Sequence, residues 1–187
     1  DVSAIRIFDN GDLTTTSGTV EIPNGTSITN YNALKSALPK YKGGWFRNLY
    51  QNSTEPTGRN ISASAKSRSI IFFTEYKPAN NYCQPEGTSL LYGVDYQTGT
   101  AVPFAVFGVD SSVTNNYGDL SETAVDLGQG MASAPKIIEN NSGGRSGSSD
   151  PTVSILTQSS TGVLQVDLAT VGTFATGRAS WMQIELD

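Results

Sequence analysis

The stretch Gly87-Thr88-Ser89-Leu90-Leu91-Tyr92-Gly93-Val94-Asp95-Tyr96-Gln97-Thr98-Gly99 decides how the rest of this chain is interpreted. Its side chains fall into two alternating sets, one of Leu90, Tyr92, Val94 and Tyr96 and the other of Leu91, Gly93 and Asp95. Such alternation predicts a β-strand with two distinct faces. Gly99 supplies the residue that a tight turn needs, and Ala101-Val102 begins the next apolar segment.

A weak internal repeat relates this stretch to a later one. Residues 64–95 run from a small-polar entry through an apolar strand and a loop to a strand that carries Val-Asp. Residues 133–167 run through Lys-Ile-Ile, a loop and Ser-Ile-Leu-Thr-Gln to a strand that also carries Val-Asp. A repeat of this kind is typical of propeller blades. Because a blade takes about 45 residues, the chain has room for roughly three or four. We predict a mainly β fold of antiparallel, propeller-blade-like sheets, either a partial β-propeller or a sandwich.

The remaining pattern predicts further strands and one short helix near residues 30–38. Thr29 or Asn30 caps this helix, and Pro39 ends it. Residues 68–76 are apolar on both faces, which predicts a central strand. We also expect strands at 3–8, 13–22, 44–50, 101–107, 136–138, 152–158, 163–168 and 178–186. We divide the chain into an N-terminal extension, residues 1–42, and a blade-like domain, residues 43–187.

The composition is that of an exported all-β protein. Of 187 residues only 16% are charged, and 19 are Gly. The net charge of −5, without any His, argues against nucleic acid and anionic membrane surfaces as partners. No apolar run approaches the roughly 18 residues that a membrane span requires. Because the chain starts at Asp1, we interpret it as a processed mature chain or a fragment.

Few residues offer metal or redox chemistry. Cys83 is the one cysteine, so neither an intramolecular disulfide nor a thiolate zinc site is expected. We interpret it as a half-buried small side chain, with an intermolecular disulfide as the alternative. Asp9, Asn10 and Asp12 contain the oxygen ligands that calcium prefers, but no suitably placed Glu ends the loop, which favours a plain turn. We predict no metal and no cofactor.

A hydrolase without His would need a carboxylate or Lys as its base. The candidate carboxylates are Glu55, Glu75, Glu86, Asp95, Asp126 and Asp167. Asp95 and Asp167 occupy equivalent ends of the two repeats, so we expect each to accept backbone N–H groups at a turn. We therefore predict no catalytic residue.

Most aromatic residues have the spacing of a strand core, and we expect them to pack rather than to bind sugars. They are Trp45, Phe46, Tyr50, Phe72, Phe73, Tyr76, Tyr92, Tyr96 and Trp181. Tyr76, Tyr82 and Tyr117 lie in or beside polar loops, and we predict them as contacts with a partner or surface.

Several motifs in one consistent order resemble the C-terminal β-propeller segment of PilY-type pilus proteins, over residues 43–187. They are Gly44-Trp45-Phe46, Gly58-Arg59, Ile70-Ile71-Phe72-Phe73-Thr74, Pro78, Cys83, Gly87–Asp95, Thr98-Gly99, Asp126–Met131, Ser159–Gly162 and Gly177–Trp181.

This resemblance implies a non-enzymatic bacterial protein at the cell surface or outside the cell, acting in type IV pilus assembly and adhesion. The expected partners are pilus subunits or the remainder of a cleaved precursor. The family carries an Asp-rich calcium loop, of which this chain has no full copy, so calcium is not expected here.

Two alternatives stay open. Incomplete blades expose strand edges, so the chain could be a structural subunit that assembles with copies of itself into an extracellular filament. The strand unit also resembles quinoprotein dehydrogenase repeats, whose propellers hold a quinone and calcium. A quinoprotein-like enzyme fragment would need polar side chains that converge in a closed funnel.

Overall fold

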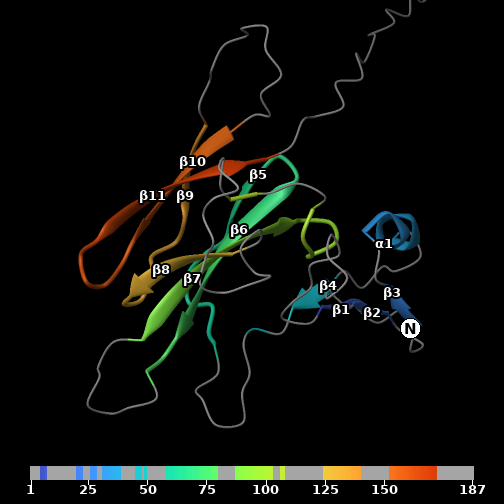
Figure 1. The fold of residues 1–187 in the computed structure, drawn as a ribbon, viewed down its shortest axis with the longest axis horizontal. Helices are drawn as coiled ribbons and strands as arrows, with labels where there is room; N and C mark the ends of the chain where they lie inside the picture. Colours follow the sequence, from blue (N-terminus) through green and yellow to red (C-terminus); the bar gives the residue numbers. More distant parts are fainter. Residues whose placement is uncertain are drawn as a thin grey trace, which may run out of the picture.

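The fold of this chain was analysed in a computed structural model. The structure describes residues 5–7, 20–22, 26–28, 31–38, 45–47, 49, 58–79, 87–102, 106–107, 124–139 and 152–171. In these residues the chain is mainly β, with three sheets and one short helix, as the sequence predicts (Figure 1).

The central sheet is a four-stranded antiparallel meander, a topology typical of a propeller blade. Its strands follow one another in chain order, β5 (Ala65–Ser67), β6 (Ile70–Lys77), β7 (Thr88–Asp95) and β8 (Ala124–Gln129). The stretch that opened the sequence analysis supplies β7, which pairs along its whole length with β6. A β-bulge between Ser89 and Leu90 shifts the register between β7 and β8.

The second sheet repeats this meander with three strands in the described residues. It contains β9 (Lys136–Glu139), β10 (Thr152–Gln158) and β11 (Leu164–Thr170), with β10 in the middle. The predicted hairpin turn after β10 contains Gly162 at a φ of 88°. Each half of the sequence repeat therefore forms an antiparallel meander, whereas the arrangement of the two meanders in a propeller stays a prediction.

The third sheet has the order β3-β2-β1-β4. Its strands are β1 (Ile5–Ile7), β2 (Val20–Ile22), β3 (Thr26–Ile28) and β4 (Trp45–Arg47), and the helix α1 (Tyr31–Ala37) lies between β3 and β4 in the chain. β1 and β4 are parallel, while the other pairs are antiparallel. Since β4 pairs with β1, one sheet joins the two predicted regions; the boundary near residue 42 stays a prediction.

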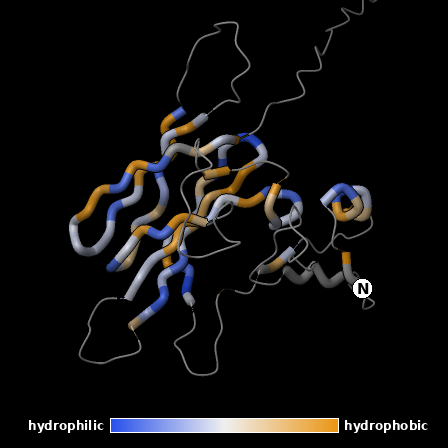
Figure 2. Tube along the Cα trace, in the orientation of Figure 1, coloured by the Kyte–Doolittle hydropathy of each residue, from blue (hydrophilic) through white to orange (hydrophobic). Residues whose placement is uncertain are grey.

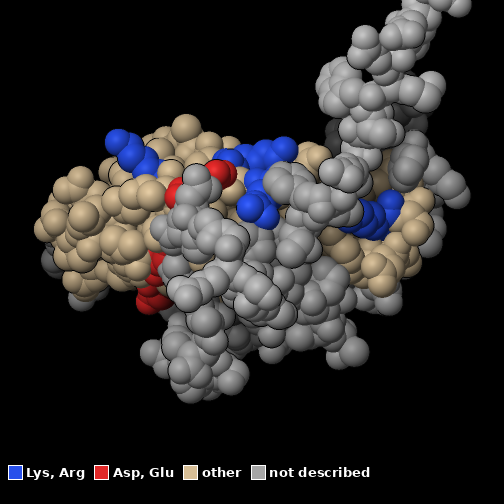
Figure 3. All heavy atoms as spheres, turned by 90° about the horizontal axis from the view of Figure 1, so that it is seen from above, with Lys and Arg blue, Asp and Glu red and all other residues tan. Residues whose placement is uncertain are grey.

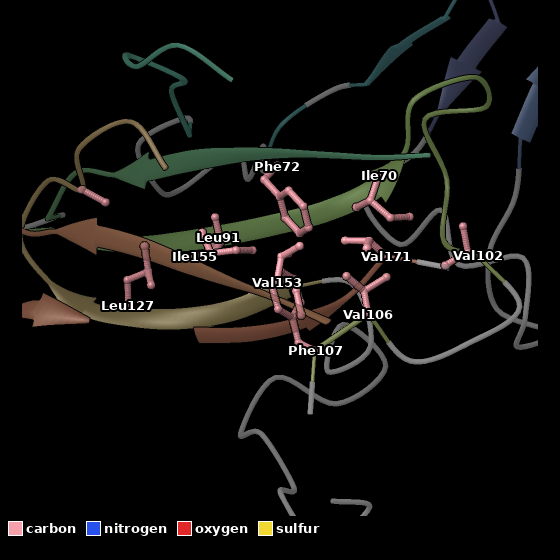
Figure 4. Close-up of a cluster of buried hydrophobic side chains, with 12 residues drawn as sticks. Ile70, Phe72, Leu91, Val102, Val106, Phe107, Leu127, Val153, Ile155 and Val171 are labelled. Carbon is pink, nitrogen blue, oxygen red and sulfur yellow. The ribbon is translucent and has the colours of Figure 1, made fainter. Parts of the chain in front are cut away.

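The main hydrophobic core lies between the central sheet and the β9–β11 sheet (Figure 4). It contains Ile70, Phe72, Leu91, Val102, Val106, Phe107, Leu127, Ala132, Val153, Ile155, Ala169 and Val171. The rings of Phe72 and Phe107 meet edge to face with centroids 6.0 Å apart. Figure 2 shows hydrophobic positions along β6, β7 and β10, the strands that face this core.

The opposite face of the central sheet is buried as well. Phe73 and Tyr92 stack with centroids 5.1 Å apart, and Val94 and Ala124 complete a second cluster. Trp45, from the third sheet, packs against this cluster. The prediction that residues 68–76 supply a central strand is confirmed for β6, because both of its faces are buried.

The structure corrects several sequence-based expectations. Arg68 and Ser69 form the turn between β5 and β6 rather than the start of a strand. In the 101–107 segment, Val102, Val106 and Phe107 belong to the core, and Phe107 forms a single antiparallel bridge with Ala169 of β11. The strand that pairs with β7 is β8, which the sequence did not predict.

The aromatic residues divide between the core and the surface. Phe72, Phe73 and Tyr92 are buried, as predicted, but Phe46 and Tyr96 are exposed, so their assignment to the core is wrong. Strand alternation identifies a face, but whether another layer covers that face depends on the tertiary structure. The strands predicted at 178–186 and within 13–19, and the turn at residues 9–12, lie outside the described residues.

In the part of the chain that the structure describes, no helix has both the length and the apolar character that crossing a membrane requires.

Replacing Phe72 with Ala is expected to lower the free energy of unfolding by about 3–5 kcal/mol, because it removes a fully buried ring from the core. Urea denaturation followed by fluorescence measures this loss. Ile155→Val, in the same core, should cost about 1 kcal/mol. The matched change Ile138→Val, on the exposed face of the same sheet, should cost almost nothing. Equal costs for the two Ile→Val variants would contradict this core.

Candidate functional site

A pocket of about 500 Å³ opens where α1, the β5–β6 turn and the end of β7 meet. The described residues that line it are Lys35, Lys66, Arg68, Ser69, Asp95, Tyr96 and Gln97, and we call it the Asp95 pocket. Three cationic side chains and one carboxylate give these described residues a formal charge of +2, in a chain whose net charge is −5. Figure 3 shows Lys and Arg side chains at the left, in the middle and at the right of the face that it draws.

Asp95 is the structural centre of this pocket. The residue is only 2% exposed, and its Oδ1 accepts a hydrogen bond of 2.8 Å from the backbone N–H of Gln97. This confirms the predicted role of Asp95 as an acceptor at the turn. Oδ2 accepts a second hydrogen bond from the hydroxyl of Tyr31. Asp95 therefore joins α1 to the end of β7, although the two elements are more than 60 residues apart in sequence.

The turn after β7 has the geometry that the sequence predicts. Gly99 has a φ of 69°, in the left-handed region that favours glycine. The N–H of Gly99 donates to the carbonyl of Asp95 at 2.7 Å, and the N–H of Asp95 donates to the carbonyl of Thr100 at 2.9 Å. These bonds hold Tyr96 and Gln97 at the tip, where both are exposed.

Tyr96 is fixed from several sides although its side chain is 39% exposed. The indole N–H of Trp45 donates to the carbonyl of Tyr96 at 2.9 Å, and the Gln97 side-chain amide donates to the Tyr96 hydroxyl at 3.0 Å. The Lys66 ammonium lies 3.7 Å from the centroid of the Tyr96 ring, a cation–π contact. The pocket therefore has a fixed aromatic wall with a cation on it.

Arg68 occupies an unusual backbone conformation. Its φ is 52°, a left-handed value that is rare for a residue other than Gly, Asn or Asp. Arg68 and Ser69 form the two-residue connection between β5 and β6, because Ser67 pairs with Ile70. A hairpin turn with positive φ at its first position favours Gly there. The left-handed backbone of Arg68 therefore costs about 1 kcal/mol in conformational free energy.

Of the predicted partner-contact residues, the structure describes Tyr76. It lies half-buried in β6, its backbone pairs with Arg59, and its hydroxyl accepts a hydrogen bond from the N–H of Gly87 at 3.3 Å. A role for Tyr76 in partner contact stays a prediction. Tyr82, Tyr117 and Cys83 lie outside the described residues, as do Glu55 and Glu86.

The described carboxylates occupy separate places. Oδ1 of Asp126 accepts from the N–H of Gly128 at 2.8 Å. Glu75 is buried in β6 beside Gly58, where a Cβ would overlap the Glu75 carboxylate. Among the described residues no three His, Cys, Asp or Glu side chains lie close enough together to hold a metal ion.

Asp167 does not cap a turn, and this part of the sequence analysis is wrong. It lies within β11 opposite Ile155, and its Oδ1 accepts from the side-chain amide of Gln165 at 3.0 Å. Burial raises the pKa of its carboxyl, and the hydrogen bond from Gln165 opposes this shift. The two repeats place their Asp residues differently because β11 continues beyond Asp167 to Thr170, whereas β7 ends at Asp95.

The amino-acid sequence did not predict that the three cations of the pocket lie together. Lys66 and Arg68 are near neighbours in the sequence beside a turn, and this pattern could have indicated two of the three cations. Lys35, however, is about thirty residues away on α1. Only the folded chain brings the three together.

Comparison with protein-family models, with curated proteins and with solved structures finds no match to this chain.

The contact between Tyr31 and Asp95 predicts how stability depends on pH. Burial, and then the hydrogen bond to Asp95, raise the pKa of Tyr31 above its usual value near 10. The folded chain therefore keeps this proton at a pH where the unfolded chain loses it. The stabilisation is complete below about pH 10 and is lost as the pH rises through the folded pKa.

Tyr31→Phe removes this titration and leaves Asp95 without one hydrogen bond. We expect the free energy of unfolding to be lower by about 1–2 kcal/mol at pH 7. Above pH 10 it should fall less steeply in the variant than in the parent chain. Urea denaturation at a series of pH values measures both effects. Parallel plots of unfolding free energy against pH for the two proteins would contradict a stabilising role for the Tyr31–Asp95 contact.

Proposed function

We propose that this chain is a non-enzymatic, pilus-associated protein at the bacterial cell surface, which acts in type IV pilus assembly and adhesion through binding. The proposal starts from the ordered motifs that resemble PilY-type proteins. Ile70–Thr74 lies in β6, Leu90–Asp95 lies in β7 and Ser159–Gly162 makes the hairpin turn of the second meander. The motifs that suggest the family are therefore residues that build these meanders.

The Asp95 pocket is the observation that favours a binding function over a catalytic one. Its carboxylate is buried and accepts hydrogen bonds from a backbone N–H and from Tyr31, so it is engaged in holding the site together. Its cations lie on the helix α1, on the strand β5 and on the two-residue turn that follows β5. Side chains held on such elements suit recognition of a ligand.

Co-sedimentation with purified type IV pili tests the pilus association. We expect the intact chain to pellet with pili in a saturable manner and to stay in the supernatant without them. The heat-unfolded chain serves as the control for non-specific trapping. Recovery of the folded chain in the supernatant at every pilus concentration would overturn the proposal.

A second candidate function, a filament subunit, is favoured by one surface. The outer face of the β9–β11 sheet exposes Ile138, Leu164 and Val166, each more than half accessible. Leu164 and Val166 lie on the same face because they pair with Gln158 and Leu156, and Ile138 joins them through Ser154. The central sheet, by contrast, is covered on both faces. In a filament this apolar face would pack against a different surface of the next copy, because two copies joined through the same face close as a dimer.

This candidate predicts association that depends on the apolar face. Light scattering after size-exclusion chromatography should show species larger than a dimer for the parent protein, because exposed apolar area is removed from water at each contact between copies. Val166→Lys should convert them to single chains without loss of thermal stability. A parent protein that elutes only as single chains at high concentration would exclude this candidate.

A further inference from the structure

The strand β11 forms an open edge of the β9–β11 sheet. Among the described residues, β11 pairs with β10 on one side, and on its other side Ala169 makes a single bridge to Phe107. Residues 163–171 contain no Lys, Arg or Pro, which commonly protect a sheet edge against pairing with another chain. The strand at the opposite edge, β9, carries the exposed side chains of Lys136 and Glu139. The first half of β11 is therefore the less protected edge of this sheet.

Main-chain hydrogen-bonding groups of β11 face this open edge. The N–H of Thr170 donates to the carbonyl of Val106 at 2.8 Å, on the side of β11 away from β10. Along a strand the main-chain groups alternate between the two sides, so those of Val166 and Leu164 point in the same direction as those of Thr170. No hydrogen bond from these outward groups of Val166 or Leu164 is found within the described residues. Val166 therefore offers one donor and one acceptor to a further strand.

The side chains of this edge suit pairing with an identical strand. Leu164 and Val166 lie on the outer face and are 61% and 59% exposed. Gln165 and Asp167 alternate with them, and the side-chain amide of Gln165 donates to Oδ1 of Asp167 at 3.0 Å. If two copies pair antiparallel with Val166 opposite Val166, Asp167 lies opposite the neutral Gln165 rather than opposite a second Asp167. This register avoids like charges directly opposite one another, which destabilise a strand pair.

We infer that β11 pairs antiparallel with β11 of a second copy of this chain, about a two-fold axis beside Val166. The N–H of Val166 in each copy donates to the Val166 carbonyl of the other, so the open groups of both edges are satisfied together. The contact is closed, because each copy uses the same edge and no equivalent edge remains for a third copy. The two three-stranded sheets then form one continuous sheet. This self-complementary register is the reason to assign the edge to a second copy rather than to an unrelated extended segment.

Disulfide formation between introduced cysteines tests the register. Val166→Cys and Leu164→Cys, two almost equally exposed positions, are compared under mild oxidation in a chain that also carries Cys83→Ser, so that the introduced thiol is the only one. Across the two-fold axis the two Cα atoms at position 166 should lie about 5.5 Å apart, within the range that a disulfide requires. The two Cα atoms at position 164 should lie roughly 14 Å apart, beyond that range. We expect Val166→Cys to form covalent dimers and Leu164→Cys to form none.

Val166→Pro tests the main-chain pairing. Proline removes the N–H that faces the open edge, and it leaves the pairing with β10 intact because Pro is tolerated in an edge strand at such a position. We expect the dissociation constant of the dimer, measured by light scattering over a dilution series, to rise at least about tenfold, because two hydrogen bonds between the copies are lost. A contact made through the outer face would survive, since proline keeps that position apolar. Val166→Thr, which keeps the N–H, is the matched control and should dimerise like the parent chain.

Single chains at every concentration of the parent protein would overturn the inference, and they are the expected result if another segment of this chain or a different protein covers the edge. Equal cross-linking of Leu164→Cys and Val166→Cys, or an unchanged dissociation constant in Val166→Pro, would also overturn it. If Val166→Pro does not fold, the two cysteine variants decide alone. The inference is independent of the proposed function, and it concerns the edge of the sheet, whereas the filament candidate uses the outer face. Dimers that do not sediment with pili would therefore refute the pilus association alone, and single chains that do sediment would refute only the pairing of β11.

Discussion

The structure depends on burial of both faces of the β6–β7 hairpin. Gly93 makes this burial possible on one face. A Cβ at that position would lie 2.8 Å from a methyl of Val106 and 3.0 Å from the rings of Phe107 and Phe72. Because glycine has no side chain, the segment containing Val106 and Phe107 can pack directly onto the hairpin. The β9–β11 sheet then covers the same core from the other side.

The same hairpin positions the candidate site. Its β7 strand ends at Asp95, and the buried carboxylate of this residue holds both the following turn and the helix α1. The β5–β6 turn reaches the same place because Ser69 and Tyr96 share a backbone hydrogen bond. The pocket is therefore a consequence of core packing, and its cations are displayed where three elements end together.

Much of the local structure follows from the amino-acid pattern. The alternation in β7, the helix before Pro39 and the hairpin around Gly162 are each predicted by neighbouring residues, and the structure confirms them. The role of Asp95 in its turn also depends on neighbouring residues, since its carboxylate oxygen accepts a hydrogen bond from the backbone N–H of Gln97, two residues further along the chain. The same reasoning failed for Asp167, because it relied on a repeat and not on the strand length that the sheet imposes.

Neighbouring residues along the chain thus established the class of fold, the central strands and the turn that carries Asp95, because side-chain periodicity and glycine geometry act over a few residues. Tertiary packing alone decided that β8 rather than the 101–107 segment pairs with β7, and that Tyr96 stays on the surface. It also brought Lys35 to Lys66 and Arg68. These outcomes depend on which distant segment covers which face, and the free energy of that choice comes from buried area shared by residues far apart in the chain.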